Sequence, residues 1–227
     1  LLGGFNQGQF RPGELALAHG GALIADEFPE WNRDARESLR QPLQDHAIHL
    51  QRREGIVHYP TRFVFIATGN LCPCGGVPPQ YQNASFKKSA ACRCRPGDVE
   101  RYLFKLSGPV ADRIDLVMVH VEMPKKSNLV CSPEQIHELK LEIAEAQSFC
   151  FKRFGNLPSQ LSPSWLEEHL PKGPSTEKIL SAAPSLRSRH KILRIARTIQ
   201  AIEKSEELKP EHLLEASSFR YEGFQSN

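Results

Sequence analysis

Two short apolar runs, each ending in polar residues, constrain the fold of this 227-residue chain most strongly. Ala22–Ala25 is followed by Asp26-Glu27, and Phe63–Ala67 is followed by Thr68-Gly69-Asn70. Continuous apolar runs of this length are typical of strands in a parallel sheet whose two faces are both covered. Helix signals over residues 31–44 separate the runs, and the order strand, helix, strand predicts a crossover unit in an α/β fold.

A β-hairpin is predicted directly after the helical segment. Apolar and polar residues alternate over residues 48–60, on both sides of Glu54-Gly55. Such alternation around a glycine-containing turn is typical of a hairpin. Arg52 and Arg53 lie at its predicted tip.

The second half of the chain is predicted to be helical. One helix runs from Pro133 to Phe154, with an apolar stripe that contains Ile136, Leu139, Ile143 and Ala146; a second spans Leu186 to Ile202; a third begins at Pro210. A last strand is expected over residues 114–123. We therefore expect an α/β part over residues 1–125 and a helical part over residues 126–227.

Charge and composition exclude few functions. The formal net charge is +3, which permits an anionic partner without indicating one. No segment approaches the roughly 18 apolar residues of a membrane span, and the first residues lack the pattern of a secretory signal. We expect a cytoplasmic protein without membrane contact, in which cysteines are thiols or metal ligands rather than disulfides.

Acidic residues at the carboxyl end of a parallel strand lie where open α/β sheets bind ligands. Asp26 is predicted to hold Mg²⁺, and Glu27 to orient and deprotonate an attacking water. The amide of Asn70, after the second strand, could hydrogen-bond a phosphate or that water. The alternatives are a strand that ends in two solvated acids and an asparagine that serves only in a turn.

Four of the six cysteines form two close pairs. Cys72 and Cys74 precede, and Cys92 and Cys94 follow, the segment 75–91. Four thiolates suffice for a tetrahedral site, and Zn²⁺ is its natural occupant. A metal-free loop or a pair of disulfides would fit the same spacing. Cys131 and Cys150 are interpreted as ordinary packing residues.

Five phrases of the chain resemble a known family: "RPGELALAHGGALIADEFPEW", "LRQPLQD", "YPTRFVFIATGNLCPCG", "RYLFKLSGPVADRIDL" and "LRSRHKILRIARTIQ". Together they resemble the magnesium-chelatase-like branch of the AAA+ ATPases, and within it the competence-associated ComM and YifB-like group. The resemblance covers nearly the whole chain. It implies part of a P-loop-type AAA+ parallel sheet with a hairpin and a zinc-binding loop, followed by an all-α lid domain.

The resemblance also implies residue roles. "LIADE" resembles a Walker B strand, with Asp26 on the metal and Glu27 as catalytic base, and Asn70 takes the place of sensor 1. Arg113 matches the arginine finger, which in this family reaches the nucleotide of a neighbouring subunit, and Arg187 matches sensor 2. Without the resemblance, Arg113 could instead pair with a neighbouring aspartate, Asp112 or Asp115.

One part of the family pattern is missing. No G-x-x-x-x-G-K-[ST] phosphate loop occurs in the sequence. We expect this Walker A element upstream of Leu1, and we expect the 227 residues alone to bind ATP poorly.

The resemblance implies an ATP-driven homo-oligomeric ring, as a hexamer, that acts on single-stranded or branched DNA, for example in branch migration. Arg52 and Arg53 would follow a phosphate backbone. A second positive surface near the cysteines is interpreted as solvated charge; it consists of Lys87, Lys88, Arg93 and Arg95. The alternatives are a chelatase-type motor subunit that remodels a protein partner, and a non-enzymatic zinc-stapled binding module.

Overall fold

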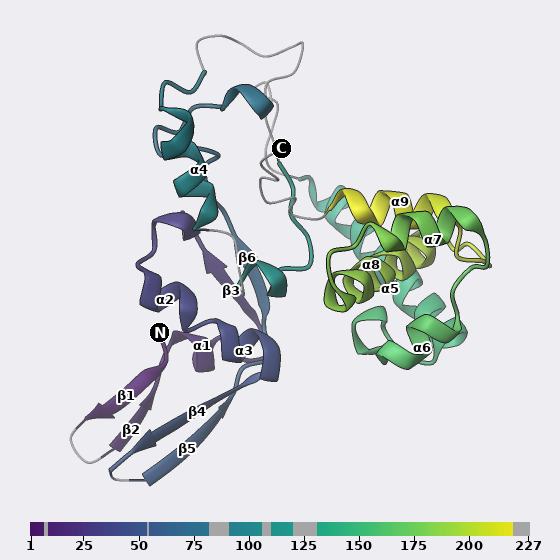
Figure 1. Cartoon of the computed structure of the whole chain (residues 1–227). Helices are drawn as coiled ribbons and strands as arrows, with labels where there is room; N and C mark the ends of the chain where they lie inside the picture. The colour runs from purple at the N-terminus through teal and green to yellow at the C-terminus, as the bar shows by residue number, and fades with distance from the viewer. Residues whose placement is uncertain (7–8, 54, 82–90, 106–109, 120–130, 220–227) are drawn as a thin grey trace. The chain divides into compact units, whose positions relative to one another are not determined.

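The computed structural model describes residues 1–6, 9–53, 55–81, 91–105, 110–119 and 131–219 (Figure 1). The chain divides between Ile114 and Asp115 into two compact units. We call them the α/β unit and the helical unit and describe each by itself. The boundary predicted at residues 125 and 126 lies outside the described residues and stays a prediction.

Two parallel strands form the predicted sheet of the α/β unit. β3 (Ala22–Ala25) pairs with β6 (Val64–Ala67), and Ala25 lies opposite Ala67. Side chains alternate between faces, so Leu23 and Phe65 pack against the core. The other face is open in the described structure, because Ile24 is 68% and Val64 62% exposed. The expectation that both faces are covered is therefore wrong for these residues.

The first part of the connection between these strands is helical, but it is not the single helix predicted over residues 31–44. It consists of η1 (Phe28–Glu30), α2 (Arg33–Glu37) and α3 (Arg40–Asp45). The Asn32 side chain caps α2 by accepting a hydrogen bond from the Ala35 N–H at 2.8 Å. Pro42 has no N–H to continue the ladder of α2, so it is accommodated in the first turn of a new helix.

Two hairpins extend side by side from the α/β unit (Figure 1). The predicted one is confirmed as β4 (Ala47–Arg52) and β5 (Gly55–Pro60). The other, β1 (Gly3–Asn6) with β2 (Gln9–Pro12), was not predicted. Helix α1 (Glu14–Leu17) follows it and buries Leu15 in the core with residues from the sheet, the helices and the predicted hairpin: Ala25, Phe28, Leu39, Ile48, Leu50 and Val110.

The rest of the α/β unit surrounds the cysteines. η2 (Pro79–Tyr81), α4 (Pro96–Phe104) and η4 (Ala111–Arg113) follow β6. Val99, Tyr102 and Leu103 of α4 form a small core with Cys72. The strand predicted over residues 114–123 is not formed in its described part, residues 114–119.

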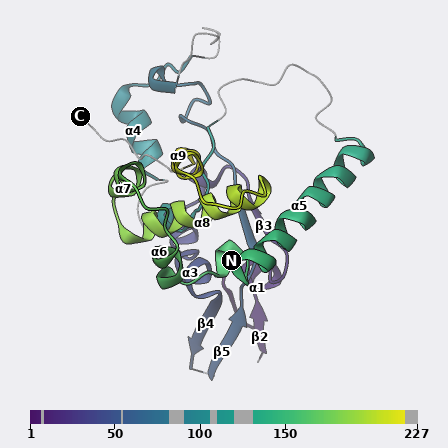
Figure 2. The ribbon, with the colours of Figure 1, turned by 90° about the vertical axis from the view of Figure 1, so that its right-hand side faces the viewer.

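The helical unit confirms the three predicted helices as α5 (Pro133–Phe154), α8 (Leu186–Ile202) and α9 (Pro210–Ser218). It adds η5 (Pro158–Gln160), α6 (Pro163–Glu168) and α7 (Pro174–Ser181). Buried residues of α8 occupy the centre of its core. Figure 2 shows that the N-terminal half of α5 extends beyond the other helices. Accordingly the predicted stripe is covered only from Ala146 onward, and Ile143 is 57% exposed.

Within the described ranges, every helix is too short or too polar to span a membrane.

Candidate functional site

The carboxyl ends of β3 and β6 bring polar side chains together, as the sequence predicts for parallel strands. Asp26 follows β3 and Thr68 follows β6, and the Thr68 hydroxyl donates a hydrogen bond to Oδ1 of Asp26. The Glu27 N–H lies 3.2 Å from Asp26 Oδ1 and 3.2 Å from Thr68 Oγ1. The Asp26 and Glu27 residues are both exposed, so their carboxylates are accessible to a ligand.

The backbone of this edge is held in place by short-range packing. Glu27 has left-handed dihedral angles, φ 48° and ψ 41°, which are unusual for a residue other than glycine. The Phe28 N–H donates to the carbonyl of Thr68 at 2.9 Å. A Cβ atom on Gly69 would lie 2.8 Å from the ring of Pro29, so this close approach needs glycine. The two strand ends are therefore fixed to each other by a backbone hydrogen bond and by the packing of Gly69 against Pro29.

Asn70 lies two residues beyond Thr68 on the same segment. It is exposed, and its backbone N–H lies near the hydroxyl of Tyr102 in α4. Burial, with Glu30 nearby, raises the pKa of Tyr102 to about 12, so this hydroxyl stays neutral. The register puts Asn70 near the same edge as the acids, and its role as a sensor stays a prediction.

Arg113 is the last residue of η4 and is half-buried. Its Nη2 donates to the side-chain oxygen of Gln44 in α3. The predicted finger is thus in contact with a helix of its own unit. Arg187 is exposed in the first turn of α8, where sensor 2 was predicted, and belongs to the helical unit.

The predicted nucleic-acid residues are only partly described. Arg53 is exposed at the hairpin tip, next to Arg52, whose side chain lies outside the described part. Arg93 and Arg95 are exposed, and Lys87 and Lys88 lie outside the described residues. The tip therefore offers at least one accessible guanidinium group.

The four paired cysteines converge on one point. The Sγ atoms of Cys72, Cys74, Cys92 and Cys94 all lie within 4.8 Å of one another. Cys72 Sγ is 3.1 Å from Cys74 Sγ, 2.9 Å from Cys92 Sγ and 3.4 Å from Cys94 Sγ. Metal–sulfur bonds of about 2.3 Å in a tetrahedron place sulfur atoms at similar separations. The donor set and its geometry fit a structural zinc site.

Backbone pairing brings the two cysteine pairs together. Val77 and Ala91 form a parallel bridge, and the Cys92 N–H donates to the carbonyl of Val77 at 3.0 Å. A Cβ on Gly76 would lie 2.8 Å from Cys92 Cα, so the chains cross as closely as glycine allows. The spacing of the cysteines in the sequence predicts the ligands. The close approach of these two segments explains how the two cysteine pairs, on either side of residues 75–91, come together.

The thiols differ in environment. Burial raises the pKa of Cys72, whereas the backbone N–H of Arg93 is the main cause that lowers the pKa of Cys74 to about 6. All six cysteines are free, so the disulfide alternative is not realised. Cys150 is buried in the helical core as expected, but Cys131 is exposed and is not a packing residue.

Sequence comparison now identifies the family. Residues 1–129 match the family "Magnesium chelatase, subunit ChlI", and residues 133–220 match "Magnesium chelatase, subunit ChlI C-terminal". The chain belongs to the magnesium chelatase ChlI family. The mixed α/β unit with its small parallel sheet and the helical unit agree with this membership.

Three relatives show how far the similarity extends. "Uncharacterized protein YifB" of Escherichia coli is 34% identical over 92% of this chain, and "Competence protein ComM" of Haemophilus influenzae is 29% identical over 92%. A Mycobacterium bovis protein, "Uncharacterized protein Mb2921c", is 43% identical over 53% of the chain. The chain spans 41% of the length of the YifB and ComM proteins.

Three contacts in this ChlI-family chain were missed from the sequence. The Thr68 hydroxyl donates a hydrogen bond to Asp26, Arg113 donates one to Gln44, and the Tyr102 hydroxyl lies near the Asn70 N–H. Thr68 begins the strand-ending triplet that contains Asn70, so its position was a usable signal. Gln44 and Tyr102 carry no such signal, because their contacts depend on how separate helices pack.

Proposed function

We propose that the natural polypeptide that carries this chain is an ATP-hydrolysing motor whose catalytic edge lies at the ends of β3 and β6. Its main support is the hydrogen bond between Asp26 and Thr68 across the two strand ends. Asp26 would hold the Mg²⁺ that accompanies the nucleotide, and this ion would neutralise phosphate charge. Oxygen ligands from a carboxylate and a hydroxyl suit that ion.

Glu27 is the proposed general base. Its backbone is fixed through Thr68 and Asp26, while the residue itself is exposed toward solvent, where it could take a proton from water. Asn70 would orient that water or a phosphate oxygen through a neutral amide. This role adds no negative charge beside the nucleotide.

Arg113 and Arg187 are the proposed cationic partners of the nucleotide. A guanidinium group stays charged and stabilises the charge that develops on a transferred phosphoryl group. Arg113 would act on the nucleotide of a neighbouring subunit, so hydrolysis would depend on assembly into a ring, as a hexamer. The contact with Gln44 would orient Arg113 before assembly.

DNA, single-stranded or branched, is the proposed substrate of the motor. Two features support this choice: the name of one relative, "Competence protein ComM", and the exposed Arg53 at the hairpin tip. A basic hairpin tip can follow a phosphate backbone by charge alone. Branch migration during recombination or natural transformation is the activity that we propose.

The cysteine cluster is proposed to hold Zn²⁺ in a structural role. Its four sulfur atoms leave no position open for a catalytic water. The ion would tie the segment after β6 to the start of α4, beside Asn70 and Tyr102. In this way it would support the catalytic edge without taking part in hydrolysis.

The DNA proposal is tested by reversing charge at the hairpin. In the natural polypeptide, Arg53→Glu should abolish the stimulation of ATP hydrolysis by DNA, and Arg33→Glu, an exposed arginine on α2, should leave it intact. DNA-independent hydrolysis should be the same in both variants. If DNA stimulates Arg53→Glu as strongly as Arg33→Glu, the hairpin does not contact DNA.

A chelatase-type motor that remodels a protein partner is the second candidate, because the family is named for magnesium chelatase. It predicts hydrolysis that DNA does not stimulate in any variant. A third candidate, a zinc-stapled binding module without hydrolysis, follows from the missing phosphate loop. It predicts no ATP turnover in the natural polypeptide even with Mg²⁺ present.

A further inference from the structure

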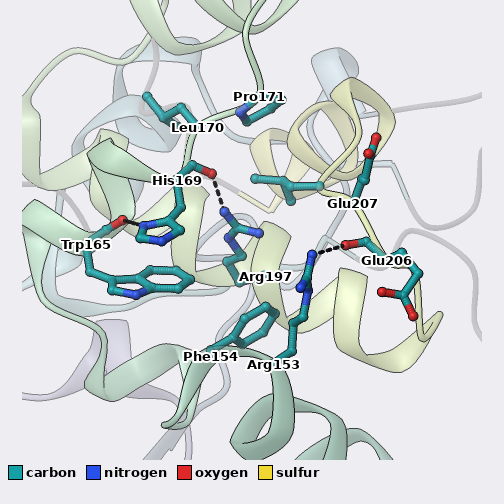
Figure 3. Close-up of a pocket in the computed structure, with 10 residues that line it drawn as sticks. Arg153, Phe154, Trp165, His169, Leu170, Pro171, Arg197, Glu206 and Glu207 are labelled. Carbon is teal, nitrogen blue, oxygen red and sulfur yellow. Dashed lines mark hydrogen bonds between the residues drawn. The ribbon is translucent and has the colours of Figure 1, made fainter.

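The helical unit contains a cavity of about 450 Å³ that none of the proposed roles above uses (Figure 3). Small-molecule sites commonly have volumes of about 300–1,000 Å³. Its walls come from the end of α5, from α6 and the segment after it, from α8, and from the segment between α8 and α9. Arg153 and Arg197 contribute two guanidinium groups, and an apolar wall is made by Leu170, Pro171 and Leu208.

Arg197 is a buried cation, with only 6% of its surface exposed. Its guanidinium carbon lies 5.4 Å from the ring centre of Phe154 and 5.2 Å from that of Trp165. Nη1 donates to the side-chain oxygen of Gln200 at 2.8 Å, and Nη2 donates to the carbonyl of His169. These partners are polar but neutral, so they solvate the charge without balancing it.

Arg153 adds a second positive charge to the cavity. It lies in the last turn of α5, and its Nη2 donates to the carbonyl of Glu206 at 3.1 Å. Burial first, and then the charge of Arg153, lowers the pKa of Arg197 to about 10. Arg197 is still protonated at neutral pH, and the two like charges repel.

No carboxylate within the described ranges forms an ion pair with either arginine. Glu206 and Glu207 do line the cavity, and Figure 3 shows the carboxylate of Glu207 pointing away from the guanidinium groups. A buried cation without a counter-charge is costly, so an anion that entered here would be stabilised.

We propose that this cavity binds a small organic anion through Arg153 and Arg197, with the apolar part of the ligand against Leu170 and Leu208. Guanidinium groups match the paired oxygens of phosphate monoesters and carboxylates, and these two groups share the chemistry that the site recognises. The rings take no direct part, because His169 stacks on Trp165 at 4.0 Å and Arg197 lies over it as well.

The test is a titration of the whole chain with phenyl phosphate, benzoate, inorganic phosphate and neutral benzyl alcohol. The indole N–H signal of Trp165 reports the cavity in a proton–nitrogen NMR spectrum, and Trp31→Phe assigns the other of the two indole signals. We expect a saturable shift with phenyl phosphate and benzoate, weaker binding of inorganic phosphate, and none of benzyl alcohol.

Two variants separate a site from general charge attraction. Arg153→Gln should weaken the binding of phenyl phosphate by about tenfold or more, because it removes one charged donor. Lys152→Gln removes the same charge from an exposed neighbour outside the cavity and should leave the affinity unchanged. Equal weakening by both variants, binding of benzyl alcohol as tight as that of phenyl phosphate, or no saturable shift with any anion would overturn the proposal.

Discussion

Gly76→Ala should disrupt the proposed zinc site without replacing any of its four cysteines. A Cβ at this position would lie 2.8 Å from Cys92 Cα, 2.9 Å from Cys92 N and 3.0 Å from Ala91 C, all backbone atoms. Ordinary carbon contacts need about 3.5–4.0 Å, so the segment that carries Cys92 must retreat by about 0.5–1 Å. Metal–sulfur distances tolerate only about 0.2 Å, so the sulfur positions cannot absorb this shift.

We therefore expect Gly76→Ala to lower zinc affinity by about 10- to 100-fold, or about 1.4–2.8 kcal/mol. The matched control is Gly97→Ala in the first turn of α4, where a Cβ meets nothing within 4 Å. Competition for Zn²⁺ between the purified chain and a chromophoric chelator measures both. The reasoning fails if Gly76→Ala binds zinc as tightly as Gly97→Ala, or if the unaltered chain binds no zinc.

Two further predictions concern single contacts. Thr68→Val removes one hydrogen-bond acceptor of the Glu27 N–H, so hydrogen exchange at that amide should be about fivefold faster by NMR, and an unchanged rate would contradict the contact. Arg189, which binds Glu167 at 2.7 Å and 2.8 Å, lowers the pKa of that carboxyl from 4.5. The ion pair should stabilise α8 fully above about pH 4.5, and this stabilisation should be lost as the pH falls through the lowered pKa of Glu167. Melting temperatures of Glu167→Gln, measured over the same acidic range, should not show that loss.

Local patterns were enough to predict much of the fold. The apolar runs of β3 and β6, the alternation in β4 and β5, and the helical spacing of α5 and α8 do not depend on distant residues. The hairpin of β1 and β2 was missed because Gly3 and Gly4 give it almost no strand signal. The break between α2 and α3 was missed because the helix signals over residues 31–44 continue across it, and Pro42 lies in the first turn of a new helix.

The candidate site likewise has residues that local motifs predict and contacts that depend on distant parts of the chain. Short motifs were enough to predict Asp26, Glu27 and the four paired cysteines. Carboxylates and thiolates can bind metal ions in any fold, so these residue types indicate their chemistry from the sequence alone. The contact between Thr68 and Asp26 depends on strand register across 42 positions, and the contact between Arg113 and Gln44 depends on helix packing. The burial of Arg197 was not predicted, because it depends on the position of α8 at the centre of its unit.

The ATP turnover of Glu27→Gln, measured in the natural polypeptide that carries this chain, tests the central claim most directly. Glu30→Gln, which alters an exposed carboxylate three residues away, serves as its control. We predict that Glu27→Gln lowers turnover by about 100-fold or more and still binds ATP, because only the proposed base is lost. Turnover by Glu27→Gln at the rate of Glu30→Gln would contradict the assignment of this strand edge as the hydrolysis site.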